Sequence, residues 1–230
     1  MSTAENVQIP AAPRVSSFKM IYTLGGVAML SGFLLVLVFQ ATEGRIAANK
    51  KAAIERAVFQ VVPGATERRT FQAVDGAVSP LAEGEASTGT VFYGAYGEDG
   101  AFLGVALPAA SQGYADIVKV LYGYDPAKEA IIGMTVLESK ETPGLGDKID
   151  KDPVFKANFD ALDAALNDAG DGLANEIVTV KNGKKANPWE IDGIAGATIS
   201  STTVGRALNA SAGELLPVVK ANLDVLKAKQ

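Results

Sequence analysis

The sequence predicts an α+β fold, in which one N-terminal transmembrane helix is followed by a single mixed α+β domain. Two observations carry this prediction: residues 20–39 form an uncharged apolar run, and the rest of the chain mixes short β-rich runs with helical periodicities. A chain of 230 residues with 48% hydrophobic and 20% charged residues can bury one core. A fully disordered chain is therefore excluded.

The apolar run has the length of a membrane span. At 1.5 Å per residue it extends about 30 Å, the thickness of the hydrocarbon core of a bilayer, and we expect a span over residues 20–42. A cleaved signal peptide and a buried core helix are the alternatives, but the run is long for a signal peptide and Phe39-Gln40-Ala41 is a poor cleavage site. Small residues in the run, which suit close packing against partner helices, are Gly25, Gly26, Ser31 and Gly32.

The segments around the span complete the N-terminal part. Residues 1–19 are expected to form a cytoplasmic tail, and residues 43–62 an amphipathic stalk helix that Pro63 and Gly64 end. The domain then takes residues 63–230. The balance of positive charges around the span leans towards a cytoplasmic domain, but long domains can cross a membrane regardless of nearby charge. The residues alone therefore leave the orientation open.

Alternating patterns predict the strands of the domain. A hairpin is expected from residues 91–96 and 101–107, and two further strands from residues 117–124 and 130–137. Each pair is separated by a short turn rich in glycine, aspartate or proline. The expected pairing is therefore antiparallel.

Helices are expected mainly in the C-terminal half. One begins with Asp152 as N-cap and Pro153 in its first turn, and continues to about residue 169. A strand over residues 176–180 and a helix over residues 202–215 follow. Pro217 is expected to begin a final helix that runs to about residue 226, because a proline suits a first helical turn.

The chain contains no cysteine and no histidine. This composition excludes a thiolate nucleophile, an imidazole base, a disulfide, iron–sulfur ligands and an ordinary zinc or haem site, so no metal site is expected. The 21 Lys and Arg against 26 Asp and Glu give a net charge of −5 without a basic patch, which disfavours nucleic acid as a partner. Redox or acid–base chemistry must then come from carboxylates, hydroxyls, backbone or a borrowed organic cofactor.

The first distinctive segment is the loop ETPGLG at residues 141–146. Pro143 and Gly144 suit a type II turn, whose third residue has a positive φ, and Gly146 removes another side chain. A flat ligand could approach the exposed backbone of such a stiff loop closely. The residues alone also fit a plain strand-to-helix connection.

The second distinctive segment is DGIAGATISS at residues 192–201, directly before the next expected helix. Small neighbours leave the Thr198 hydroxyl accessible. Unpaired amides and the positive end of the helix dipole stabilise an anion here, including a phosphate linked to Thr198. The alternative is a simple helix start with Ser200 or Ser201 as N-cap.

Together the two segments resemble the FMN-binding domain family. Asp192, Ala195-Gly196-Ala197-Thr198 and Ser201 match the pattern Asp-x-x-(Ser/Ala/Thr)-Gly-Ala-(Thr/Ser)-x-x-(Ser/Thr) of proteins that carry flavin mononucleotide (FMN) on a threonine through a phosphoester. The loop at residues 141–146 resembles the other motif of the same family, and two motifs in the expected order are more specific than either alone. Over residues 18–215 the chain looks like RnfG, the G subunit of the Rnf ion-translocating electron-transport complexes. The alternative is the C subunit of the sodium-translocating NADH:quinone oxidoreductases, which shares the domain and both motifs.

The resemblance implies roles for individual residues. Thr198 would be the covalent attachment point of FMN, and a separate flavin transferase that takes FMN from FAD would recognise Asp192, Ala195, Gly196, Ala197, Thr198 and Ser201. The loop at residues 141–146 would lie against the isoalloxazine ring, with backbone N–H groups near its polar edge and Leu145 over one face. Tyr114 is a further candidate, with a half-buried strand position as its alternative. The residues implied to bind the cofactor are Glu141, Thr142, Pro143, Gly144, Leu145, Gly146, Gly196, Ala197, Ser200 and Ser201.

The resemblance also implies a function. The protein would be an electron-carrier subunit, without catalytic residues of its own, in a membrane complex that couples ferredoxin and NAD(H) chemistry to ion movement. Its partners would be the other membrane and redox subunits, and its soluble domain would lie on the periplasmic side of the inner (plasma) membrane. Two other classes of protein stay open. A stand-alone flavin enzyme would need an additional substrate domain, for which 230 residues leave no room. An anchored interaction module without a redox role would give a colourless purified protein.

Overall fold

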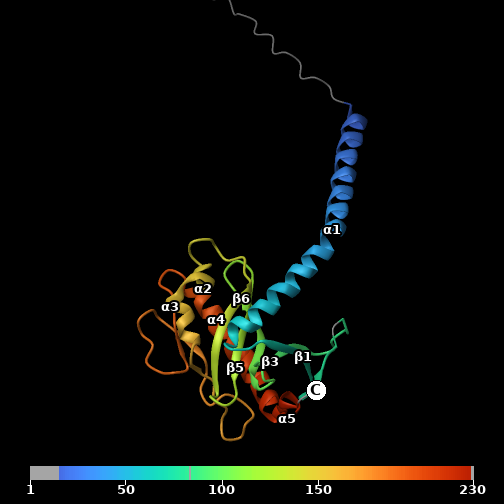
Figure 1. The fold of residues 1–230 in the computed structure, drawn as a ribbon. Coiled ribbons are helices and arrows are strands. Elements are labelled where there is room, and N and C mark those ends of the chain that lie inside the picture. Colours follow the sequence, from blue (N-terminus) through green and yellow to red (C-terminus); the bar gives the residue numbers. More distant parts are fainter. Residues whose placement is uncertain (1–15, 83, 229–230) are drawn as a thin grey trace, which may run out of the picture. The chain divides into compact units, whose positions relative to one another are not determined.

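The computed structural model describes residues 16–82 and 84–228. The chain divides into two compact units, residues 1–50 and 51–230. The described part of the first unit is helical, and the second unit holds the sheet and the other helices (Figure 1). Most of the expected cytoplasmic tail, residues 1–15, lies outside the described residues.

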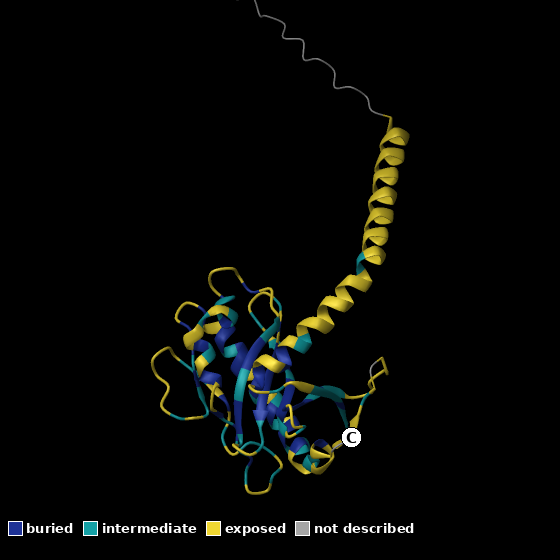
Figure 2. Cartoon of the chain, viewed as in Figure 1, coloured by how far each residue is buried: buried dark blue, intermediate teal, exposed yellow. Residues whose placement is uncertain are grey.

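A single helix, α1 (Ser17–Val61), contains both the expected membrane span and the expected stalk. It includes an 18-residue window with a mean hydropathy of 2.1, and is long and apolar enough to cross a membrane. Within the first unit its large apolar side chains are exposed (Figure 2), so this surface needs a covering of lipid or protein. The glycines of the described part of this unit, each with open space where a side chain would lie, are Gly25, Gly26, Gly32 and Gly44.

The second unit is built on a seven-stranded antiparallel sheet with the strand order β2-β1-β3-β4-β5-β6-β7. The hairpin of β3 and β4 and the pair of β5 and β6 confirm the strands expected from the alternating sequence. The strands of this sheet are β1 (Glu67–Val74), β2 (Ala77–Pro80), β3 (Thr90–Tyr96), β4 (Phe102–Gln112), β5 (Ile117–Asp125), β6 (Ala130–Glu138) and β7 (Leu162–Asp163).

The remaining elements complete a mixed α+β domain, as predicted. A small parallel pair contains β8 (Val178–Val180), a shorter form of the strand expected there, and β9 (Glu190–Asp192). The helices are α2 (Lys148–Lys151), α3 (Pro153–Lys156), the 3-10 helix η1 (Ala157–Phe159), α4 (Thr198–Ala221) and α5 (Leu223–Lys227).

Two cores lie on opposite faces of the sheet. On β5, Tyr122 belongs to the larger core, to which α4 contributes Leu208. The preceding residue, Leu121, belongs to a smaller core with Val58 and Val61 from the last turns of α1. This part of α1 lies within the second unit. Because successive side chains of a strand point to opposite faces, α4 and the end of α1 cover opposite sides of the sheet.

Two glycines let the end of α1 approach the sheet. Gly123 and Gly133 lie opposite each other on β5 and β6. A Cβ atom at Gly133 would lie 2.6 Å from the carbonyl oxygen of Val61, and a Cβ atom at Gly123 would collide with the same oxygen. The missing side chains therefore permit this contact between helix and sheet backbone.

The end of α1 is thus part of the domain core, although the sequence suggested a domain that begins at residue 63. We expect a fragment of residues 51–230 to stay folded and monomeric, and a fragment of residues 63–230 to unfold or aggregate. Burial of one valine stabilises a fold by about 1.5 kcal/mol or more, and the shorter fragment loses both Val58 and Val61. Size-exclusion chromatography and thermal unfolding of both fragments test this, and equal melting temperatures would contradict it.

The helix expected over residues 152–169 is wrong in length. It does begin with the expected cap, because Asp152 Oδ1 accepts the N–H of Val154 at 2.9 Å, but α3 ends at Lys156. Leu162 instead pairs with β6 as part of β7. Strand pairing overrides the helical spacing here, and the apolar residues of that spacing are nevertheless all buried: Phe155, Phe159, Leu162 and Leu166.

Two expectations about the last helices are also wrong. Helix α4 begins at Thr198 rather than near residue 202, so Ser200 and Ser201 lie inside its first turn and neither is the N-cap. Pro217 does not begin a new helix but lies within α4. A proline inside a helix costs about 3 kcal/mol, and burial of its neighbours offsets this cost. These buried neighbours are Leu215, Leu216 and Val219.

Candidate functional site

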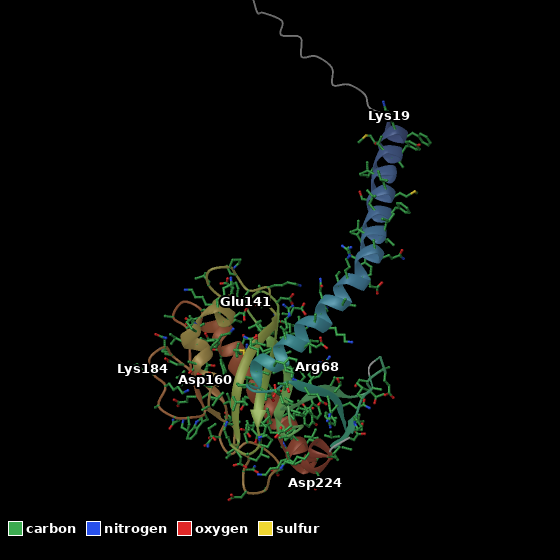
Figure 3. The ribbon with its side chains drawn as sticks, viewed as in Figure 1. Lys19, Arg68, Glu141, Asp160, Lys184 and Asp224 are labelled. Carbon is green, nitrogen blue, oxygen red and sulfur yellow. The ribbon has the colours of Figure 1, made fainter. Side chains whose placement is uncertain are left out.

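A cavity of about 530 Å³ opens where three chain segments meet. The segments are the turn between β4 and β5, the loop between β6 and α2, and the N-terminus of α4; Figure 3 labels Glu141 at this end of the domain. Both distinctive sequence segments therefore line one site, although they are far apart in the chain. The lining residues are Tyr114, Glu141, Thr142, Leu145, Gly146, Gly196, Ala197, Thr198, Ile199 and Ser200.

The loop between β6 and α2 contains the predicted type II turn. Gly144 has a φ of +79°, and the Leu145 N–H donates to the Thr142 carbonyl at 3.2 Å. Asp147 closes the loop by accepting the Gly144 N–H at 2.7 Å. The Lys151 ammonium, 2.6 Å from the Asp147 carboxylate, holds the pKa of Asp147 below its ordinary value. The loop is therefore a closed and internally bonded turn.

Three amides of this loop already donate hydrogen bonds within the loop. The N–H of Gly144 donates to Asp147, and those of Leu145 and Gly146 donate to Thr142. These three groups are therefore not available to the polar edge of a ligand, where the sequence suggested such amides. Donors to such an edge would come from other groups of the lining, such as the first amides of α4.

The second segment makes Thr198 the first residue of α4. Gly196 has a φ of +82°, which residues with a side chain rarely adopt, and Ala197 N–H donates to the Ile194 carbonyl at 3.0 Å. Ser201 fixes this turn, because its hydroxyl donates to the Ala197 carbonyl at 2.8 Å and accepts the Ile194 N–H at 3.0 Å. The Thr198 side chain is left exposed at the cavity.

The start of α4 supplies hydrogen-bond donors to the cavity. The first amides of a helix have no carbonyl partner within the helix. Helix α4 has 24 residues, and the positive end of its dipole lies at Thr198. These groups favour binding of an anion, such as a phosphate, at this position.

The backbone turn at Gly196 gives a direct prediction. Gly196→Ala should destabilise the protein by about 1–2 kcal/mol, the cost of a left-handed conformation for a residue with a side chain. Open space around Gly196 excludes a steric clash as the cause. The control is Gly213→Ala, within α4 and also in open space, which should be neutral or slightly stabilising. Urea unfolding measures both, and equal free energies of unfolding would contradict the role of this turn.

Glu141 is the buried charge of the cavity, with only 6% of its surface exposed. One carboxylate oxygen accepts the N–H of Ala115 at 3.0 Å, and the other accepts a hydrogen bond from the hydroxyl of Ser200. This side chain therefore connects the turn after β4 with the first turn of α4.

Three large side chains around the cavity stay exposed. Tyr114 is 70% exposed, Leu145 51% and Ile199 53%, and each comes from a different one of the three segments. Apolar groups gathered at the mouth of a cavity are typical of a site that a ligand or a partner covers.

Several predicted residues lie outside the cavity lining. Asp192 is the last residue of β9, and its carboxylate accepts the N–H of Gly183 in the turn after β8 at 2.7 Å. The predicted residues that do not line the cavity are Pro143, Gly144, Asp192, Ala195 and Ser201.

Two residues around the site have no counterpart among the sequence predictions. Ile199 lines the cavity and is exposed. Once the start of α4 is known, an exposed apolar side chain in its first turn indicates a residue that contacts a ligand or a partner. Asn158 is buried and holds the backbone of Asp192: its side-chain oxygen accepts the Asp192 N–H at 2.9 Å, and its amide donates to the Asp192 carbonyl at 3.2 Å. No local pattern marks Asn158, because its partner is 34 positions away.

The site fits a flat aromatic ligand that carries a phosphate. Its volume lies within the range of about 300–1,000 Å³ that is common for small-molecule sites. The apolar rim suits a ring system, and the exposed Thr198 hydroxyl beside the N-terminus of α4 suits the phosphate.

The comparison with known proteins agrees with this chemistry. Residues 113–212, which contain all the cavity-lining residues, match the family model of the FMN-binding domain. Fold and site thus define an FMN-binding domain joined to a helix of membrane-spanning length. The chain is 30% identical to the G subunit of an ion-translocating oxidoreductase complex from Pseudomonas aeruginosa, over 203 residues that cover 86% of this chain and 88% of the relative. It belongs to this family of G subunits, which confirms the family inferred from the two motifs.

Two further similarities are more limited. The chain is 37% identical over 101 residues to the G subunit of a Na⁺-translocating ferredoxin:NAD⁺ oxidoreductase complex from Acetobacterium woodii, a match that covers 44% of this chain and 43% of the relative. The crystal structure of Shewanella oneidensis NqrC has a TM-score of 0.61 and 18% identity, and covers 79% of this chain and 100% of that chain. The second similarity is a similarity of fold.

Proposed function

We propose that this protein carries electrons within a membrane-bound ion-translocating oxidoreductase complex, through an FMN attached by a phosphoester to Thr198. The observation that carries the proposal is the exposed Thr198 side chain, at the first residue of α4 and in the lining of the cavity that both motifs share. Membership of the G-subunit family supports the setting, because the relatives are named as subunits of such complexes. The FMN-binding domain match supports the cofactor.

Attachment requires a flavin transferase that uses FAD. Thr198 Oγ1 forms a bond to the phosphorus of the FMN half, the bond between the two phosphates of FAD breaks, AMP leaves, and the hydroxyl proton is released. The linking phosphate keeps one negative charge next to the positive end of the α4 dipole. The protein thus places the new charge where its electrostatic cost is small.

The residues of the cavity would hold the cofactor in a fixed position. Tyr114, Leu145 and Ile199 present apolar surface to the ring. Gly146 lets its loop pack directly on Ser200 and Glu141, because a Cβ atom there would lie 2.7 Å from each of these side chains. Bound FMN supplies the redox chemistry that a chain without cysteine or histidine lacks. The protein holds the ring and excludes water from part of it.

Membrane attachment is proposed to depend on the first unit. Residues 20–42 of α1 would cross the membrane, with the tail before them in the cytoplasm and the FMN-binding domain on the periplasmic side. A covalent bond suits that side, because a flavin that dissociates outside the cytoplasm is lost by dilution. The small surface around Gly25, Gly26 and Gly32 would pack against helices of partner subunits.

The first test is the flavin content of the full-length protein made together with a flavin transferase. After denaturation, intact mass should show the addition of FMN less one water, and a gel should show flavin fluorescence at the protein band. The purified protein should also bleach with a reductant and regain its absorbance in air. An unmodified protein, produced beside a second substrate that the same transferase does modify, would overturn the covalent carrier. A protein that is also colourless would favour an anchored interaction module.

A further inference from the structure

The carboxylate of Glu141 is the centre of the hydrogen bonds around the cavity. It joins the Ala115 amide, in the turn that carries Tyr114, to the Ser200 hydroxyl in α4. Glu141 itself belongs to the loop between β6 and α2, so one side chain connects all three segments that line the site. Movement of this side chain would therefore loosen the arrangement of the whole cavity.

Two glycines pack directly on this carboxylate. A Cβ atom at Gly113 would lie 2.5 Å from Glu141 Oε1, and one at Gly146 would lie 2.8 Å from Glu141 Oε2. The backbone of both loops thus contacts the carboxylate without an intervening side chain. A neighbouring salt bridge, Lys140 to Asp116 at 2.6 Å, ties the same two loops together on the surface.

The negative charge of Glu141 is also placed to act on the cavity. The side chain is buried, lines the cavity, and has no ion pair with a lysine or arginine among the described residues. Its two oxygens accept hydrogen bonds from neutral donors, the Ala115 amide and the Ser200 hydroxyl. A buried charge is screened less by water and salt than an exposed one.

We propose that Glu141 is a positioning residue with an electrostatic effect: it holds the three segments around FMN, and its fixed negative charge keeps the reduction potential of the bound FMN low. This inference rests on the proposed function. Because electrons carry negative charge, a negative charge beside the site disfavours their arrival. Replacement of the carboxylate by a neutral group of the same shape should therefore favour reduction.

The test compares three variants of the full-length protein, each made with the flavin transferase and purified in detergent. In Glu141→Gln the amide keeps the shape: its oxygen still accepts from Ala115, and its nitrogen can donate to the Ser200 oxygen. Glu141→Ala removes both hydrogen bonds. Glu138→Gln is the matched control, because Glu138 is only three positions before Glu141, at the end of β6, but its carboxylate is exposed and lies 2.8 Å from the Lys119 ammonium.

We expect Glu141→Gln to acquire FMN as the wild type does, and its reduction equilibrium constant to rise at least tenfold, which is about 30 mV for a two-electron couple. Glu138→Gln should change this constant less than twofold. In Glu141→Ala the rate of FMN attachment should fall at least tenfold, and Glu141→Gln should restore it. The measurements are a potentiometric titration with absorbance, the intact mass over time, and the melting temperature of each variant.

Each part of the inference can fail separately. A wild-type potential in Glu141→Gln would overturn the electrostatic effect. Wild-type attachment in Glu141→Ala would overturn the positioning role; if this variant is unfolded by its melting curve, Ser200→Ala, which removes only the donor from α4, replaces it in the attachment assay. Absence of FMN from the wild type itself would instead overturn the proposed function.

Discussion

Thr198→Ala is expected to abolish the covalent flavin completely while the domain stays folded. The hydroxyl oxygen of Thr198 is the atom that would form the phosphoester. Alanine has no such oxygen, so no flavin can be attached at this residue in the variant. The Thr198 side chain is exposed, and substitutions at exposed positions usually change stability by less than about 0.5 kcal/mol. Intact mass of the denatured protein, after production with the transferase, measures the loss.

Two control variants separate the hydroxyl from other effects of the mutation. Thr198→Ser keeps a hydroxyl at the same position and should keep the mass of the attached FMN. Thr202→Ala removes a threonine one helical turn further along α4 and should also leave the flavin in place. A covalent flavin on the Thr198→Ala protein would show that another residue is the attachment point.

Gly123→Ala is expected to give the largest loss of stability among the glycine substitutions considered. The added Cβ would collide with the carbonyl oxygen of Val61, which is backbone and cannot rotate away. The end of α1 must then move off the sheet and expose part of the smaller core. We expect a loss of about 3 kcal/mol or more, and a melting temperature lower by about 6–12 °C, since about 1 kcal/mol shifts a domain of this size by about 2–4 °C.

The control for this change is again Gly213→Ala, where the same substitution adds a methyl group in open space within a helix. Thermal unfolding followed by circular dichroism compares the two proteins. If both melt like the wild type, the contact between Val61 and the sheet does not limit the approach of α1. The Gly133→Ala variant should resemble Gly123→Ala, because both methyl groups meet Val61.

The central strands could be predicted from the sequence because their information is local. Residues 117–124 and 130–137 alternate between two cores, and a short turn separates them. The early end of the helix expected over residues 152–169 could not be predicted. The apolar spacing of this segment fits a helix, while the pairing of Leu162 with Ile131 of β6 joins residues 31 positions apart. Distant pairing of this kind leaves no local signal.

The candidate site was predictable to a similar extent. The motifs indicated the loop at residues 141–146 and Thr198, and the structure brings these segments together around one cavity. The connecting role of Glu141 was not predictable, because its partners Ala115 and Ser200 lie 26 and 59 positions away. The start of α4 was missed because Ser201, which resembles an N-cap in the sequence, stabilises the turn from inside the helix.

The burial of the second motif bears on the order in which the protein folds and is modified. In the folded domain Ser201 is fully buried, and Asp192 uses its carboxylate to hold the turn at Gly183. A flavin transferase that acts on the finished fold, as proposed above, would therefore meet mainly the exposed positions of the motif, Ala195, Gly196, Thr198 and Ile199. Under that order of events the buried positions would act through the shape they give the acceptor loop, and attachment of the flavin would report that the loop has folded.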